Sequence, residues 1–185
     1  MSTTVAIVVI ILIVIAAVMA WAFMQRRRTT TLRRRYGPEY DRAVEEYGDR
    51  TRAERALEQR TERTEKYQIR TLSSEEQRHF SEDWRRTQAR FVDDPLLAVR
   101  DADDLVCQAM RTRGYPMADF ERRAEDISVD HPRVVRNYRA AHRIAVEANE
   151  GRATTEDLRQ AMVHYRELFD ELLEIQPAGV PGRRS

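Results

Sequence analysis

An unbroken run of 20 apolar residues near the N-terminus constrains this chain more than any other feature. The run covers residues 5–24 and reads VAIVVIILIVIAAVMAWAFM. As an α-helix it is about 30 Å long, which matches the hydrocarbon core of a bilayer. The first 25 residues carry no charged side chain, and all 63 charged side chains lie in the other 160 residues. We therefore expect a single transmembrane helix at 5–24, preceded by a short tail at 1–4.

The residues that follow the apolar run determine its expected orientation. No basic residue precedes the run, whereas six arginines follow it within the juxtamembrane segment 25–37: Arg26, Arg27, Arg28, Arg33, Arg34 and Arg35. Because positively charged flanks stay in the cytoplasm, we expect the N-terminus outside the bacterial cell membrane and the C-terminal domain in the cytoplasm. The same six arginines are expected to contact the membrane surface, including anionic lipid headgroups.

A cleaved signal peptide is the alternative to a retained anchor. Ala20, Trp21 and Ala22 have the small-x-small form of a cleavage site. The residues before the run carry no positive charge, however, and the run is longer than the roughly 7–15 apolar residues of a signal peptide. We therefore predict a retained anchor. Export of the helical domain to the outer side of the membrane is the competing interpretation.

The segment 38–70 is predicted to be a charged helical stalk. Pro38 suits the first turn of a helix, and the segment is rich in Glu, Arg and Ala. Its apolar stripe thins out after Tyr47, which favours a solvated helix over a coiled coil with a poor seam. A homo-oligomer through this stalk, or through the small residues Ala16 and Ala20 of the apolar run, is a further expectation.

Four long helices and one short helix are predicted in the segment 72–175. Helix starts are marked by residues that favour the N-cap position: Ser73, Asp94, Asp119, Asp130 and Thr154. Apolar residues recur at helical spacing after each start, and about 100 residues with such stripes can bury one core. We therefore predict an all-α fold with a compact bundle of four to five helices. The Pro/Gly/Arg-rich residues 176–185 are predicted to be a disordered tail.

No catalytic, cofactor or metal motif is visible in the linear sequence. The one cysteine, Cys107, has no base beside it, and the four histidines form no His-x3-His or HExxH pattern. The acidic group that begins at Asp101 lacks the glycine of an EF-hand loop. We therefore expect no cofactor, no metal and a non-enzymatic protein. An enzyme would need a site assembled in three dimensions, for example from His142, His164 and a carboxylate.

The charge balance argues against nucleic acid as a partner. Residues 36–70 carry 8 basic and 9 acidic groups, and residues 71–185 carry 18 basic and 22 acidic groups. Neither part has the positive excess that a phosphate backbone attracts. We therefore expect a protein partner. The predicted turns present Tyr115, Met117 and His131 as a candidate interface, and turns that cap the core explain these three residues equally well.

Several segments resemble a family of uncharacterised small bacterial single-pass membrane-anchored proteins, whose members are often labelled as secreted. The resemblance covers nearly the whole chain and rests on these segments: GPEYDRAVEEYGDR (37–50), FVDDP (91–95), RGYP and DFE (within 113–121), SVDHPRVVRNYRAAH (128–142) and TEDLRQAMVHYRELFDELL (155–173). No activity is assigned to that family, so the resemblance implies no catalytic residue. It implies a GC-rich bacterial origin, consistent with 31 arginines and one lysine. The sequence thus predicts a protein-interaction or scaffold module at the cytoplasmic membrane surface.

Overall fold

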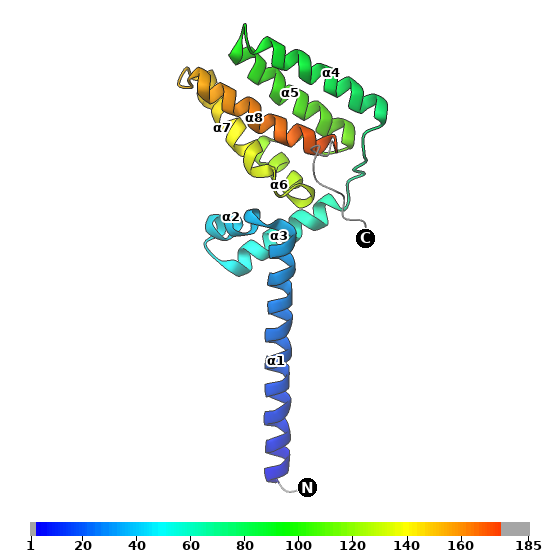
Figure 1. The fold of residues 1–185 in the computed structure, drawn as a ribbon. Helices are drawn as coiled ribbons and strands as arrows, with labels where there is room; N and C mark the ends of the chain where they lie inside the picture. Colours follow the sequence, from blue (N-terminus) through cyan, green and yellow to red (C-terminus); the bar gives the residue numbers. More distant parts are fainter. Residues whose placement is uncertain (1–2, 175–185) are drawn as a thin grey trace, which may run out of the picture. The chain divides into compact units, whose positions relative to one another are not determined.

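The computed structural model describes residues 3–174, with side chains from residue 10 onward (Figure 1). Within that range it contains eight α-helices and no strand: α1 (Thr3–Tyr36), α2 (Pro38–Tyr47), α3 (Arg50–Thr64), α4 (Ser74–Arg90), α5 (Pro95–Arg113), α6 (Phe120–Asp130), α7 (Val135–Asn149) and α8 (Thr155–Leu172). The predicted all-α fold is confirmed. The chain divides into an N-terminal unit, residues 1–57, and a C-terminal unit, residues 58–185. The predicted tail at 176–185 lies outside the described residues.

Helix α1 continues without a break from the apolar run through the arginines that follow it. Between Ile10 and Met24 its large apolar side chains are 48–69% exposed, so no other described element covers them. By length and composition, α1 is the one described helix that can cross a membrane. The prediction of a single N-terminal apolar helix is therefore confirmed at this level.

The segment predicted as a helical stalk, 38–70, is helical only as far as Thr64, and it is not a straight solvated stalk. Helices α2 and α3 are separated by a turn at Gly48. Apolar side chains of α1, α2 and α3 are buried together within the N-terminal unit: Leu32, Tyr36, Tyr40, Ala43, Ala53 and Leu57. The Tyr36 hydroxyl donates a hydrogen bond to the Leu57 carbonyl oxygen at 2.7 Å. The apolar stripe of the segment 38–70 is too thin for a coiled coil. It packs against the end of α1 and not along a second long helix.

Helices α4 to α8 form the predicted bundle, with one core. Helix α8 packs along both α5 and α7, and α4 packs on α5 (Figure 1). Helix α4 is joined to this core by aromatic rings. Trp84 of α4 stacks on Phe169 of α8, with the ring centroids 4.8 Å apart. The apolar stripes predicted for α5 and α8 are the ones that are buried.

The last turns of α3 belong to the C-terminal unit and are held there by charge. Arg63 donates hydrogen bonds to one Asp126 oxygen from Nε at 2.8 Å and from Nη2 at 2.6 Å. The Tyr67 hydroxyl donates to the other oxygen at 3.3 Å. Asp126 is 1% exposed, and a buried carboxylate requires such partners. This cluster attaches the start of the C-terminal unit to α6.

Most of the predicted helix starts are confirmed, and one is wrong. Ser73 and Thr154 form capping boxes, and Asp94 and Asp119 accept hydrogen bonds from first-turn amides. Asp130, in contrast, is the last residue of α6, and α7 begins at Val135 without a side-chain cap. Its carboxylate accepts a hydrogen bond from the Tyr115 hydroxyl at 3.0 Å. A tertiary partner therefore outweighs the local signal at this position.

Candidate functional site

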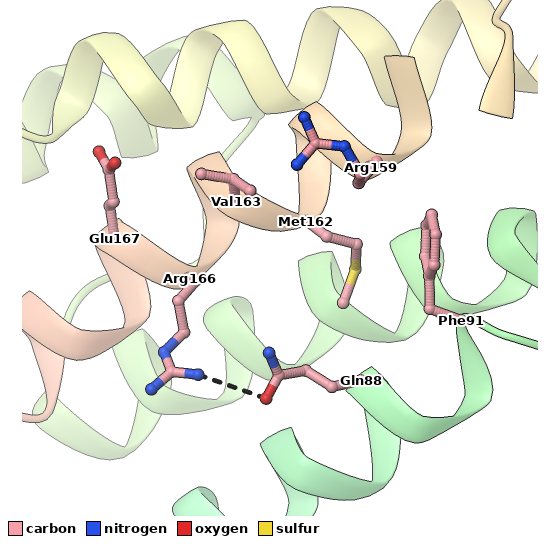
Figure 2. A pocket seen from close by; sticks show the side chains of 7 residues that line it. All are labelled: Gln88, Phe91, Arg159, Met162, Val163, Arg166 and Glu167. Carbon is pink, nitrogen blue, oxygen red and sulfur yellow. Dashed lines mark hydrogen bonds between the residues drawn. The ribbon is translucent and has the colours of Figure 1, made fainter. Parts of the chain in front are cut away.

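A groove of about 290 Å³ lies between α4 and α8 of the C-terminal unit (Figure 2). Its lining side chains come from these two helices and from the residue that follows α4: Gln88, Phe91, Arg159, Met162, Val163, Arg166 and Glu167. Met162 extends from α8 toward the Phe91 ring, and the two form an apolar floor (Figure 2). Val163 is 40% exposed beside them. The volume is at the lower limit of the about 300–1,000 Å³ of small-molecule pockets, which suits a few inserted side chains.

Two arginines stand at the rim of the groove, and neighbouring acids orient both. Arg159 donates to Glu156 from Nε at 2.8 Å and from Nη2 at 2.7 Å. This pairing holds the pKa of Glu156 at about 2. Arg166 donates from Nε to Asp170 at 2.8 Å and from Nη1 to Gln88 at 3.3 Å (Figure 2). The two arginines are seven residues apart, which separates them by about 10.5 Å along α8.

The rim arginines retain unused donor capacity. Within the described residues, Nη1 of Arg159 and Nη2 of Arg166 have no hydrogen-bond partner, and about half of each side chain is exposed. A guanidinium that is already held in place loses little entropy when it binds a carboxylate or carbonyl oxygen. The groove therefore combines an apolar floor with two oriented, partly unsatisfied donors.

Local sequence signals fix the two helices that form the groove. Thr154 and Asp157 exchange the hydrogen bonds of a capping box, which sets where α8 begins and which of its side chains face inward. These hydrogen bonds lower the pKa of Asp157. On the other side, α4 ends at Arg90, and Asp94 starts α5 four residues later. Phe91, the residue that follows α4, lines the groove from this short turn.

The predicted interface residues Tyr115, Met117 and His131 do not form an exposed surface. Tyr115 is 3% exposed and His131 is 8% exposed, while Met117 is partly buried against the core. His131 lies between Arg113, with nitrogen atoms 3.5 Å apart, and Glu171, whose oxygen is 3.3 Å from its Nδ1. The structure thus supports the alternative that these turns cap the core.

The six predicted membrane-surface arginines all lie on the last turns of α1. Arg28 is half-buried, and the other five are exposed. Arg27 stacks over the Phe23 ring at 4.4 Å, and Arg33 pairs with Asp41 at 3.1 Å. Their position directly after the exposed apolar side chains is the one expected for residues that contact a membrane surface.

A polar cluster inside the bundle brings together side chains from three helices. Asp103 and Cys107 come from α5, Arg123 from α6, and Tyr138 and His142 from α7. Arg123 donates to the Tyr138 hydroxyl at 3.3 Å. Burial raises the pKa of Asp103 and of the Cys107 thiol, and burial lowers the pKa of His142. Each shift favours the neutral form, whereas a nucleophilic thiol needs a lowered pKa.

His142 and His164, the two histidines that the sequence allows as a shared site, have different surroundings. The charged groups that act on His142 are Asp103, Arg123 and Glu121. His164 belongs to α8 and is not among them. Over residues 3–174 no group of three or more His, Cys, Asp or Glu side chains is arranged to hold a metal ion. Among the described residues His142 therefore lies near the Asp103 carboxylate without a hydrogen bond or ion pair to it, and His164 is not part of this group.

Comparisons with protein-family models, with curated proteins and with solved structures found no match. The functional interpretation therefore depends on the geometry described above. Helical spacing of apolar residues predicts a buried face for α4 and for α8, but it does not predict the groove between them. The only available signal was Val163, an apolar residue outside the buried stripe of α8 and adjacent to Met162.

Proposed function

We propose that this protein is a non-enzymatic, single-pass membrane-anchored module that presents a helical bundle to a protein partner at the cytoplasmic membrane surface. The observation that carries the anchor is the exposure of every large apolar side chain from Ile10 to Met24. Five Val, five Ile, Leu12 and Phe23 favour insertion of residues 5–24 into a bilayer by about 4–7 kcal/mol. A water-exposed helix of this composition would aggregate, so a lipid environment is its natural partner.

The orientation in this proposal follows from charge. Six arginines lie on the C-terminal side of the apolar run, and residues 1–25 contain no charged side chain. The positive-inside rule counts Lys and Arg within roughly 15–20 residues of a span, and all six lie within that distance. The bundle then faces the cytoplasm, and the short N-terminal tail lies outside.

The groove between α4 and α8 is the surface we assign to the partner. Its occupant is an amphipathic helix with one large apolar side chain that enters between Phe91 and Met162. Carboxylates on the same helix would accept hydrogen bonds from the Arg159 and Arg166 guanidinium groups, each of which has a terminal nitrogen that no other described group engages. Carboxylates two turns apart match the about 10.5 Å between the two arginines.

Site-specific photocrosslinking in cells tests this assignment with the full-length protein. A photoreactive amino acid replaces Val163 in the groove or, as the control, Arg136, an exposed residue of α7. We expect Val163 to capture one segment of one partner, and sequencing of the crosslinked peptide to show an amphipathic helix with carboxylates beside an apolar residue. The Arg136 position should not capture that segment.

Charge reversal then tests whether carboxylates of the captured segment bind the arginines at the rim of the groove. Arg159→Glu should lower the crosslink yield by about tenfold, and exchange of the facing partner carboxylate for Arg should restore it. The groove assignment is contradicted if Arg136 captures the same segment with equal yield. A captured segment without carboxylates, or a yield that Arg159→Glu leaves unchanged, would also contradict it.

A further inference from the structure

A second pocket, of about 450 Å³, lies entirely within the N-terminal unit, between α1 and α3. Helix α1 contributes Trp21, Arg26 and Thr29 to its lining, and α3 contributes Arg50, Thr51 and Glu54. The sequence did not predict it, because Arg26 and Arg50 are 24 positions apart and meet only when α3 folds back along α1. The pocket is more polar than the groove of the C-terminal unit.

The two arginines of this pocket are available to a ligand. Within the described residues, neither the Arg26 nor the Arg50 guanidinium makes a hydrogen bond or an ion pair, whereas Arg33 of the same helix pairs with Asp41. Asp49, the residue before Arg50, caps α3, and one of its carboxylate oxygens accepts a hydrogen bond from the Arg52 amide at 2.8 Å.

The one acidic side chain in the lining, Glu54, has its own partners. It is 4% exposed, and its Oε1 atom accepts hydrogen bonds from the Thr29 hydroxyl at 2.7 Å and from the Tyr40 hydroxyl at 2.9 Å. These hydrogen bonds hold α1, α2 and α3 together. Two guanidinium groups therefore face the pocket against one carboxylate that is already hydrogen-bonded, which leaves an excess of positive charge.

The position of the pocket along α1 identifies the kind of anion. Trp21 belongs to the apolar run, is 65% exposed and lines the membrane-proximal end of the pocket. Tryptophan at the end of a span lies at the level of the lipid headgroups. Arg26 follows about 7.5 Å further along the helix axis, where the phosphates of the same leaflet would lie.

We propose that this pocket binds the phosphate-diester headgroup of an anionic phospholipid, with Arg26 and Arg50 as donors to the phosphate oxygens. The chemistry recognised is a phosphate oxyanion, which guanidinium groups bind with paired hydrogen bonds. Thr51 supplies a further hydroxyl donor at the start of α3. The inference rests on the proposed membrane anchor, because only an inserted α1 brings the pocket to headgroup depth.

The test uses the full-length protein, reconstituted in vesicles that contain equal amounts of phosphatidylglycerol and phosphatidylcholine. Native mass spectrometry after mild detergent extraction counts the lipids that remain bound. Both lipids carry a phosphate diester, but the choline ammonium of phosphatidylcholine offsets its negative charge. We therefore expect the wild type to retain phosphatidylglycerol preferentially and R26Q/R50Q to retain about tenfold less of it. The matched control is R34Q/R35Q, which removes two exposed charges of the same arginine cluster outside the pocket.

Three further results separate the outcomes. Equal losses in R34Q/R35Q and R26Q/R50Q would show that the arginines act as a diffuse charge, which overturns the pocket. Complete release of the lipid by millimolar inorganic phosphate would assign the site to a free phosphate instead of a headgroup. Flotation of each variant with the vesicles reports insertion: a wild type that fails to float refutes the anchor, whereas a protein that floats without lipid preference refutes only this inference.

Discussion

Replacement of Gly114 by alanine should be one of the most destabilising small changes in the C-terminal unit. Gly114 follows α5 with a φ of +99°, and a Cβ atom there would lie 2.5 Å from the Gln68 carbonyl oxygen. The chain at 68–70 is held close by two hydrogen bonds. The Arg70 amide donates to the Arg113 carbonyl oxygen at 2.8 Å, and Arg113 Nε donates to the Arg70 carbonyl oxygen at 3.1 Å.

Two separate costs determine the magnitude. A residue with a Cβ in this left-handed conformation costs about 1–2 kcal/mol. Relief of the 2.5 Å contact requires movement of the backbone at 68–70, which weakens both hydrogen bonds and costs about 2 kcal/mol more. We therefore expect Gly114→Ala to lower the free energy of unfolding by about 3–4 kcal/mol.

Gly151→Ala is the matched control. Gly151 also has a positive φ, +72°, but a Cβ there would meet nothing within 4 Å. Only the conformational cost applies, so the expected loss is about 1–2 kcal/mol. The difference between the two variants isolates the contact with Gln68.

Urea unfolding of the full-length protein in detergent micelles measures both variants. In a Trp21→Phe background, the fluorescence of Trp84 reports on the C-terminal unit, because this side chain is 3% exposed and stacked on Phe169. Equal destabilisation by the two alanine variants would refute the argument, since it would show that 68–70 does not press against the end of α5.

Three further predictions concern ionisable groups. Arg63→Met leaves the 1%-exposed Asp126 carboxylate without its cation and should cost about 3–5 kcal/mol in urea unfolding, and the further change Asp126→Leu should recover most of this loss. Because Arg70 helps to lower the pKa of Glu76 from 4.5 to about 2, the contribution of Glu76 to stability is complete above about pH 4.5 and is lost as the pH falls toward 2. Glu76→Gln should remove that part of the acid dependence, and an unchanged pH profile would contradict the assignment. Burial raises the pKa of Cys107, so iodoacetamide at pH 7 should modify the folded protein more slowly than the urea-unfolded chain, as measured by mass spectrometry, and equal rates would contradict this.

Local signals in the sequence were the most reliable guide to the fold. A cap such as that of Ser73 or Thr154 involves only residues within one helical turn, so neighbouring sequence is enough to predict it. Asp130 carries the same kind of signal but bonds to Tyr115, which is 15 positions away. No local pattern contains that information.

The parts that sequence reasoning missed depend on helices that meet only after folding. The core of the N-terminal unit forms because Tyr36 of α1 reaches Leu57 of α3. With α1 as a partner, the few apolar residues of the segment 38–70 are enough to form a core. The groove needs Gln88 of α4 to approach Arg166 of α8, 78 positions later. The sequence predicts Tyr115 and His131 as surface residues because their hydrogen-bonding partners are distant in sequence: Asp130 is 15 positions from Tyr115, and Glu171 is 40 positions from His131.

In the function proposed for this protein, residues 5–24 remain as an anchor and leave the bundle in the cytoplasm. A dual reporter fused after Ser185 tests it directly: a phosphatase that is active only outside the membrane and a fluorescent protein that folds only inside. We predict fluorescence without phosphatase activity, in a full-length product that fractionates with the membrane. Phosphatase activity without fluorescence, or a shortened product that has lost the apolar run, would contradict the account and place the bundle outside the cytoplasm.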